Sequence, residues 1–532
     1  MRQWFPRSRF VAKIDEVIKI ENEKEESVAL KEEQVLKDIV QENTTKKNKK
    51  NNYSFGRRVI RIPLSKDTLN ETTITRYLPF ILQMHYQNVI DYRHLKGVYT
   101  GEESHIWKKT REDSKYTSNS TVEEGHPFRI VEFKKGYLYG EDVTYSYLKD
   151  TTCSDDLTYF NKFMQEQDKA SKNVDISEDV FIAGSGIRFI LPKKRDKTFN
   201  PRKQSPFEIY NLDYECSFIV YSSNYTKEKL FGGIITTIDS LDPNEIKYEI
   251  MLYDHQFAYI YNAKGRNGMP LSNPAFKYKM PHYLGVCNFV EYKTNKSRIS
   301  IIERIETLLD ANNEISSYAL DNIKDFVNAI LVVYNQKMSK SSQENINKNK
   351  AMLLQTNDPL RPADAKYLVN ELNLSEVSTK QEAIIALAYS IAGVPLATTK
   401  STSGGDTGEA RELGGGWSSA DEVAKQEEKG LIKAEREMLE ICLSICKKTP
   451  NCPIDEIESS DIDIVFNRSN RDNLLVKMQA LKYAYDMKLP KEASLNIVRV
   501  TSNSHEIAHQ WEENDKGNIE DEQNKGLKEV IE

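Results

Sequence analysis

The string His505-Glu506-Ile507-Ala508-His509 has the residue types and spacing of a zinc peptidase motif. On a helix, the two histidines would share one face and bind zinc, and Glu506 would activate the metal-bound water. The surroundings do not favour this chemistry, because only a polar acidic stretch follows the string and nothing there could hold a third ligand rigidly. We therefore interpret the string as part of a surface helix and keep a zinc metallopeptidase as the alternative.

Two further groups of residues have types suited to chemistry. Cys442, Cys446 and Cys452 contain no CxxC pair, and no paired histidine completes a metal set, so buried free thiols are expected. The glycine-rich stretch SGGDTGEA lacks the Gly-Lys-Ser/Thr of a P-loop, which excludes the lysine that would contact the β- and γ-phosphates. The sequence therefore predicts no enzyme, no metal and no cofactor.

The composition argues against a protein that grips nucleic acid over its whole surface. The 532 residues include 74 Lys and Arg against 80 Asp and Glu, a formal charge of −6, whereas nucleic-acid-binding surfaces are strongly basic. Six cysteines are too few for a disulfide scaffold and indicate a reducing compartment. No secretory signal opens the chain and no apolar stretch reaches ~18 residues, so we expect a soluble, intracellular type of protein without membrane contact.

The elements that must position these residues begin with a helix and a sheet. The apolar spacing over 74–95 predicts a helix. Between Phe128 and Gln256, segments rich in Val, Ile, Tyr and Phe alternate with period two, which predicts an antiparallel sheet of short strands. The predicted strands include FRIVEFKKGYLYG and DVFIAGSGIRFIL, and we expect the pairs Tyr137/Tyr139 and Tyr145/Tyr147 to be ordinary sheet-face residues.

The second half of the chain is predicted to be mostly helical. A first long helix over 299–334 has apolar residues at alternating spacings of four and three. A polar insert follows it and contains a short helix near Asp364–Leu372. A second helix is expected over 378–393, starting at a capping box of Ser378 with Gln381 and stopped by Gly393.

A loop and a third long helix come next. The loop 394–416 holds six glycines, and an unstructured loop of this length is usually functional or disordered. The third helix is expected to start at a capping box of Ser419 with Glu422 and to carry an apolar seam that only Glu427 interrupts, with its other charges on the exposed side. The strand DIDIVF, two small helices (Arg471–Met487 and Lys491–Val500) and an acidic tail complete the pattern.

Three stretches carry a family resemblance. They are GVPLATTKSTSGGDTGEAREL (393–413), GWSSADEVAKQEEKGLIKAEREML (416–439) and NRSNRDNLLVKMQALKYA (467–484). With the order of elements over 59–511, they make the chain similar to the portal (head–tail connector) proteins of tailed bacteriophages. The resemblance is strong in residue detail only over about 375–500.

The resemblance implies an α+β portal-type fold, with a mixed α/β wing, long stem helices, a small α/β clip, a long kinked wing helix and a helical crown. The implied divisions are a charged N-terminal arm at 1–58, the wing at 59–298, stem helix 1 at 299–334, the clip at 335–377, stem helix 2 at 378–393, the channel loop at 394–416, the long wing helix at 417–449, the crown at 450–511 and an acidic disordered tail at 512–532.

The resemblance also implies where partners would bind. The channel loop would contact DNA through Lys400, Ser401, Thr402, Ser403, Gly404, Gly405, Asp406, Thr407, Gly408 and Arg411. The clip would dock the terminase through Lys340, Asn345, Lys348, Lys350 and Arg361.

A portal of this type is a ring of about twelve subunits at one capsid vertex. Double-stranded DNA would be packaged and later ejected through its channel. Its expected partners are other copies of the chain, the terminase large subunit, the major capsid and scaffolding proteins and a head–tail adaptor. The expected location is the virion, with the host cytoplasm during assembly. Besides the zinc peptidase, a structural scaffold or adaptor without a channel remains an alternative.

Overall fold

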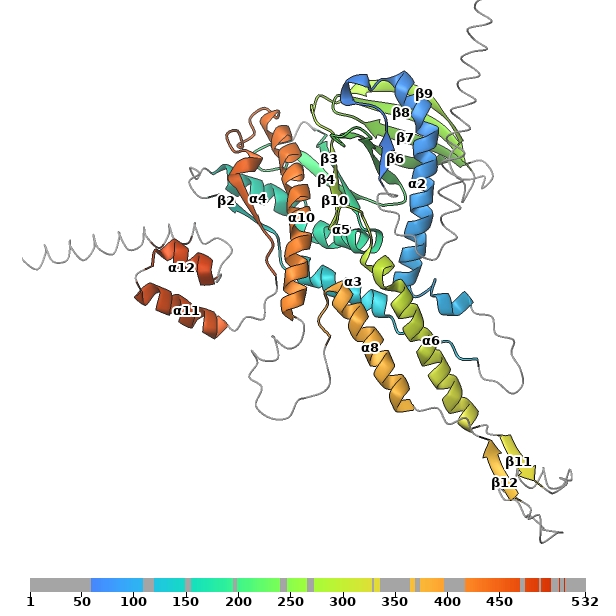
Figure 1. Cartoon of the computed structure of the whole chain (residues 1–532). Helices are drawn as coiled ribbons and strands as arrows, with labels where there is room; N and C mark the ends of the chain where they lie inside the picture. Colours follow the sequence, from blue (N-terminus) through green and yellow to red (C-terminus); the bar gives the residue numbers. More distant parts are fainter. Residues whose placement is uncertain are drawn as a thin grey trace, which may run out of the picture.

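The computed structural model describes most of the chain between Val59 and Val498 (Figure 1). The described residues are 59–108, 119–148, 155–194, 199–239, 246–265, 272–327, 330–334, 364–368, 374–396, 417–468, 474–487 and 489–498, with Ile507 and Trp511. The predicted arm at 1–58 and the acidic tail at 512–532 lie outside these residues.

A six-stranded sheet forms the first layer of the body. Its strands are β1 (Ile60–Ile62), β5 (Ser217–Ser222), β6 (Lys229–Asp239), β7 (Ile246–Tyr253), β8 (Phe257–Gly265) and β9 (Ser272–Pro281), in that spatial order. Only β1 and β5 run parallel; the other neighbours are antiparallel. Helix α2 (Glu71–Thr100) covers one face, because Ile74, Leu78 and Ile81 recur at helical spacing and pack against Phe218 and Tyr259 of the sheet.

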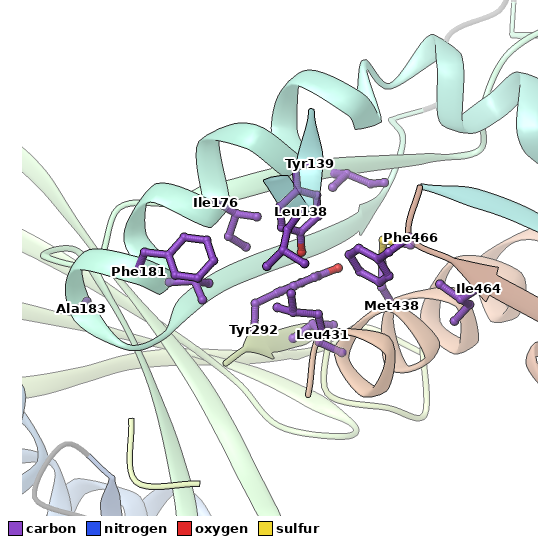
Figure 2. Close-up of a cluster of buried hydrophobic side chains, with 14 of the residues drawn as sticks. Leu138, Tyr139, Ile176, Phe181, Ala183, Tyr292, Leu431, Met438, Ile464 and Phe466 are labelled. Atoms are coloured by element: carbon purple, nitrogen blue, oxygen red, sulfur yellow. The ribbon is translucent and has the colours of Figure 1, made fainter. Parts of the chain in front are cut away.

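A second, three-stranded sheet lies against the main hydrophobic core. Its strands are β10 (Phe289–Tyr292), β3 (Gly186–Pro192) and β4 (Phe207–Leu212). The core is closed by α3 (His126–Tyr139), α4 (Asp156–Glu166), α5 (Lys169–Ala183), α10 (Trp417–Lys447) and the two-stranded sheet of β2 (Thr144–Tyr147) with β13 (Ile462–Val465). Figure 2 shows Leu138, Phe181, Tyr292, Leu431 and Met438 meeting in this core from segments far apart in sequence.

Two long helices leave the body side by side. Helices α6 (Ile301–Val327) and α8 (Leu374–Ala392) pack along each other, and beyond them lies the hairpin of β11 (Ile330–Tyr334) and β12 (Asp364–Leu368) (Figure 1). The C-terminal helices α11 (Leu474–Asp486) and α12 (Lys491–Val498) pack on each other. The mixed α+β class expected from the sequence is confirmed, as are the helix over 74–95, the third long helix and the strand DIDIVF.

One predicted strand is a helix. FRIVEFKKGYLYG forms α3, and DVFIA is the last turn of α5, with the strand β3 starting only after Gly184. Ile130, Val131 and Leu138 of α3 are buried against the core, so tertiary packing selected the helical spacing over the period-two alternation also present in these residues. Tyr137 and Tyr139 are therefore buried helix residues, whereas Tyr145 and Tyr147 lie in β2 as predicted.

The first long helix of the second half is shorter than predicted. The expected helix over 299–334 ends at Val327, and Ile330–Tyr334 forms β11, because this β-branched run pairs with β12. The predicted short helix at Asp364–Leu372 was also wrong, since Asp364–Leu368 is the partner strand β12.

Both predicted capping boxes were misplaced. Helix α8 begins at Leu374, before Ser378, and α10 begins at Trp417, before Ser419. The predicted cap residues therefore lie inside the helices. The predicted end of the second helix was right, since Gly393 has a φ of +64° that favours glycine.

Candidate functional site

The flanks of the predicted channel loop are fixed on the body. At the end of α8, a Cβ on Gly393 would approach Val423 of α10 to 2.8 Å, and the Val394 N–H donates to the Tyr389 carbonyl at 2.9 Å. At the start of α10, the Trp417 ring packs on Phe133 and Tyr137 of α3. Both ends of the loop are thus held independently of the loop itself. The predicted contact residues Lys400 to Arg411 lie outside the described residues.

The ends of the hairpin strands fix the two points between which the segment with the predicted docking residues runs. Strands β11 and β12 are antiparallel, with Ile330 opposite Leu368 and Tyr334 opposite Asp364. The segment 335–363 therefore leaves and re-enters the hairpin at one end. The clip residues named from the sequence, Lys340, Asn345, Lys348, Lys350 and Arg361, all belong to this segment and lie outside the described residues.

The helix pair exposes an unusual amount of apolar surface. Among the described side chains of α8, only Ala388, Tyr389 and Ala392 are buried, although the helix is rich in apolar residues. Leu387 is 52% exposed and Ile323 of α6 is 51% exposed. Large exposed apolar side chains on both helices, Tyr318, Leu320, Ile323, Leu387 and Ile391, make up what we call the stem apolar surface. Exposed apolar side chains on both members of a helix pair are available for contact with a neighbouring molecule.

The C-terminal helices show the same feature. Met478, Tyr483, Tyr485 and Met487 in and just after α11 are at least half exposed. Two short helices packed on each other bury little apolar area, and these side chains are available to a neighbour. No helix among the described residues is long and apolar enough to cross a membrane.

A buried charge network in the core was missed from the sequence. The Glu435 carboxylate on α10 accepts hydrogen bonds from Lys169 Nζ at 2.9 and 3.0 Å, Tyr145 Oη at 2.7 Å and Tyr292 Oη at 2.9 Å. Arg188 Nη1 lies 3.6 Å away. Glu435 was expected on the exposed side of its helix, yet its side chain is completely buried. The signal was present, since Leu431 and Leu439 lie one helical turn to either side of it.

The electrostatics of this network are those of a structural ion cluster. Burial would raise the pKa of Glu435, but the charges of Lys169 and Arg188 outweigh it and hold that pKa below its usual value. Burial lowers the pKa of Lys169 to about 7. Tyr145 and Tyr292 close the cluster from β2 and β10, so a substrate has no access to the carboxylate. The network connects α5, β2, β3, β10 and α10.

The structure describes the three cysteines of one candidate metal site and only one residue of the HExxH string. Cys442 and Cys446 are fully buried free thiols and Cys452 is partly buried, as expected. Among the residues that the structure describes, no group of three or more His, Cys, Asp or Glu side chains could hold a metal ion. Of the HExxH string, only Ile507 is described; it is helical and exposed, and His505, Glu506 and His509 lie outside the described part.

Comparison with known proteins connects these surfaces to one family. No curated protein matches the chain significantly. A family model described as phage portal protein, SPP1 Gp6-like, matches residues 78–521. That match includes the helix pair, the hairpin, both flanks of the predicted channel loop and the C-terminal helices. Because it covers most of the chain, the protein belongs to the phage portal protein family.

Proposed function

We propose that the chain forms a closed ring at one vertex of a phage capsid, through which double-stranded DNA is packaged and later ejected. Family membership supports a portal role and a location in the virion capsid. The observation that carries the ring is the stem apolar surface, since Ile323 and Leu387 are half exposed on a pair of helices that leaves the body. Assembly would take place in the host cytoplasm.

The placement of this surface favours a head-to-tail contact. Its side chains lie on two different helices, so one helix of a subunit can contact the other helix of the next subunit, and such contacts close into a ring. We propose about twelve subunits, as in portals generally. A formal charge of −6 suits a channel through which DNA slides, because every neutralised phosphate adds affinity.

The contacts with DNA, the terminase and the adaptor are assigned to two segments, 394–416 and 335–363, each of which is bounded at both ends by helices or strands that the structure describes. We assign the loop 394–416 to the channel, where Lys400 and Arg411 supply its only positive charges. We assign 335–363, at the end of the hairpin, to docking of the terminase large subunit and then of a head–tail adaptor. The capsid and scaffolding proteins would contact the outside of the ring.

Native mass spectrometry combined with negative-stain imaging tests the ring. The full chain should form a closed oligomer whose central hole is wide enough for duplex DNA. The double variant Ile323→Glu/Leu387→Glu should dissociate into monomers, because buried charge at a subunit contact is strongly unfavourable. Ile238→Glu is the matched control, since Ile238 is 59% exposed on β6, outside the helix pair. A monomeric wild type, or equal dissociation of the control, would contradict the proposal.

Shortening the loop tests the channel assignment separately. Deleting 401–405 should leave ring assembly and thermal stability unchanged, because Gly393 and Trp417 hold the two flanks on the body. DNA packaging should then fail or stall. If the shortened chain does not assemble, the loop is structural. If it packages DNA normally, the loop is a passive linker.

A further inference from the structure

A segment before α3 runs along α6 and is held to it by a regular series of hydrogen bonds. Three backbone N–H groups at alternate positions donate to side chains of α6 spaced four residues apart. The pairs are Ser120 to Asp321 Oδ1 at 2.6 Å, Val122 to Ser317 Oγ at 3.0 Å and Glu124 to Asn313 Oδ1 at 3.3 Å. Two extended residues advance ~6.6 Å and four helical residues advance ~6 Å, so the two repeats match over this length. We call residues 119–125 the strap.

The carboxylate of Glu124 connects three helices. It accepts hydrogen bonds from Asn312 Nδ2 at 2.9 Å and from the Ser316 hydroxyl on α6, and from Gln381 Nε2 on α8 at 3.1 Å. His126 Nε2, at the start of α3, donates to it at 2.8 Å. This hydrogen bond is the largest cause that lowers the pKa of Glu124 to about 2. The group therefore stays ionised throughout the physiological range, and its hydrogen bonds are charge-assisted.

The contacts that hold α6 are apolar in its first turns and polar further along the helix. In its first turns Ile302, Ile305 and Leu309 are buried in the main core. From Asn312 to Lys324, the last α6 side chain that the structure describes, the buried side chains are polar, and the strap contacts Asn313, Ser317 and Asp321 among them. Apolar burial is lost only when the core opens, whereas hydrogen bonds to a strap can be exchanged for bonds to water at small net cost. The outer half of α6 is thus held by contacts that can be released while the core stays closed.

We propose that the strap is a latch that fixes the outer halves of α6 and α8, and with them the hairpin, to the body, and that Glu124 is its positioning residue. The strap lies between α2, which covers the large sheet, and α3, on which Trp417 at the start of α10 packs. Gly125 joins the strap to α3 with a φ of +65°, a backbone conformation that favours glycine. The latch does not depend on the portal function, although a portal could use it to connect its outer body with its hairpin end.

Hydrogen exchange of the full chain, followed by mass spectrometry, tests the latch. Glu124→Ala should speed amide exchange in 312–324 of α6 and 375–385 of α8 by about tenfold or more, a factor equivalent to about 1.4 kcal/mol. Exchange in 301–309 of α6 should stay unchanged, because the apolar core holds that part. Glu102→Ala is the matched control, since Glu102 is exposed at the end of α2.

A second variant separates a latch from general loosening. Gln381→Leu removes the bonds from α8 to Glu124 and to the Ser316 hydroxyl of α6, and it leaves the bonds of Asn312 and Ser316 to Glu124 in place. It should speed exchange in α8, and it should speed exchange in 312–324 of α6 less than Glu124→Ala does, because the strap still holds that part of α6. Unchanged exchange in Glu124→Ala, or acceleration that extends to 301–309, would overturn the proposal. Neither result bears on ring formation, which native mass spectrometry of the same samples reports independently.

Discussion

Neutralising Glu435 should destabilise the body more than any other single charge removal on α10. In Glu435→Gln the carboxylate that lies 2.9 Å from Lys169 Nζ and 3.6 Å from Arg188 Nη1 becomes a neutral amide. Arg188 stays buried without a counter-charge, and the new amide N–H₂ group faces donors. Lys169, whose pKa burial lowers to about 7 although Glu435 raises it, must either stay charged without its partner or lose its proton. Breaking a buried ion pair by removing one partner costs about 3–5 kcal/mol. Folded domains are stable by only ~5–15 kcal/mol.

The expected change in melting temperature follows from the size of the body. At roughly 2–4 °C per kcal/mol for large domains, the variant should melt about 6–20 °C below wild type. Thermal unfolding of the full chain followed by circular dichroism measures this. Glu440→Gln is the matched control, because Glu440 is exposed on the same helix and undergoes the same chemical change. Its free energy of unfolding should change by no more than ~0.5 kcal/mol.

A double variant distinguishes the charge argument from a packing defect. If the uncompensated Lys169 charge causes the loss, Lys169→Met combined with Glu435→Gln should be less destabilising than the sum of the two single changes. Arg188 remains in the double variant, so recovery should be partial. A melting temperature of Glu435→Gln equal to that of Glu440→Gln would refute the reasoning, and so would strict additivity in the double variant.

Three further predictions concern pH, packing and metal. Burial lowers the pKa of His85 from 6.5 to about 4, so between these pH values the unfolded chain binds more protons than the folded chain. The free energy of unfolding should therefore fall as the pH drops through this range, by about 3 kcal/mol in total at ~1.36 kcal/mol per unit. Denaturant titrations at several pH values should show this loss, and His85→Gln should remove it. Gly232→Ala places a Cβ 2.2 Å from the buried Phe289 ring and should destabilise by about 1–3 kcal/mol in denaturant titrations, whereas Gly136→Ala, with open space at its Cβ, should be neutral or stabilising. Elemental analysis should find no stoichiometric zinc; zinc that is lost together with peptidase activity in His505→Ala/His509→Ala would instead support the peptidase.

What the sequence determined by itself is local and periodic. The seam of α10 and the amphipathic spacing of α2 extend over many turns, so the helices were predictable without knowing their neighbours. The stop at Gly393 was also predictable, because the positive φ that ends a helix favours one residue type. The family resemblance rested on the same kind of information, namely the order of such elements around a glycine-rich loop.

Only the tertiary structure decided features that depend on distant partners. FRIVEFKKGYLYG fits both periods, and the core chose the helix α3. Ile330–Tyr334 became a strand because Asp364–Leu368 lies beside it. Glu435 is buried because Lys169 and two tyrosines from other elements hydrogen-bond it and Arg188 forms an ion pair with it. Glu124 joins α6 to α8 in the same way, through hydrogen bonds from residues distant in sequence. A buried charge is stable only with its partners in place, and residues more than a hundred positions away in sequence supply them.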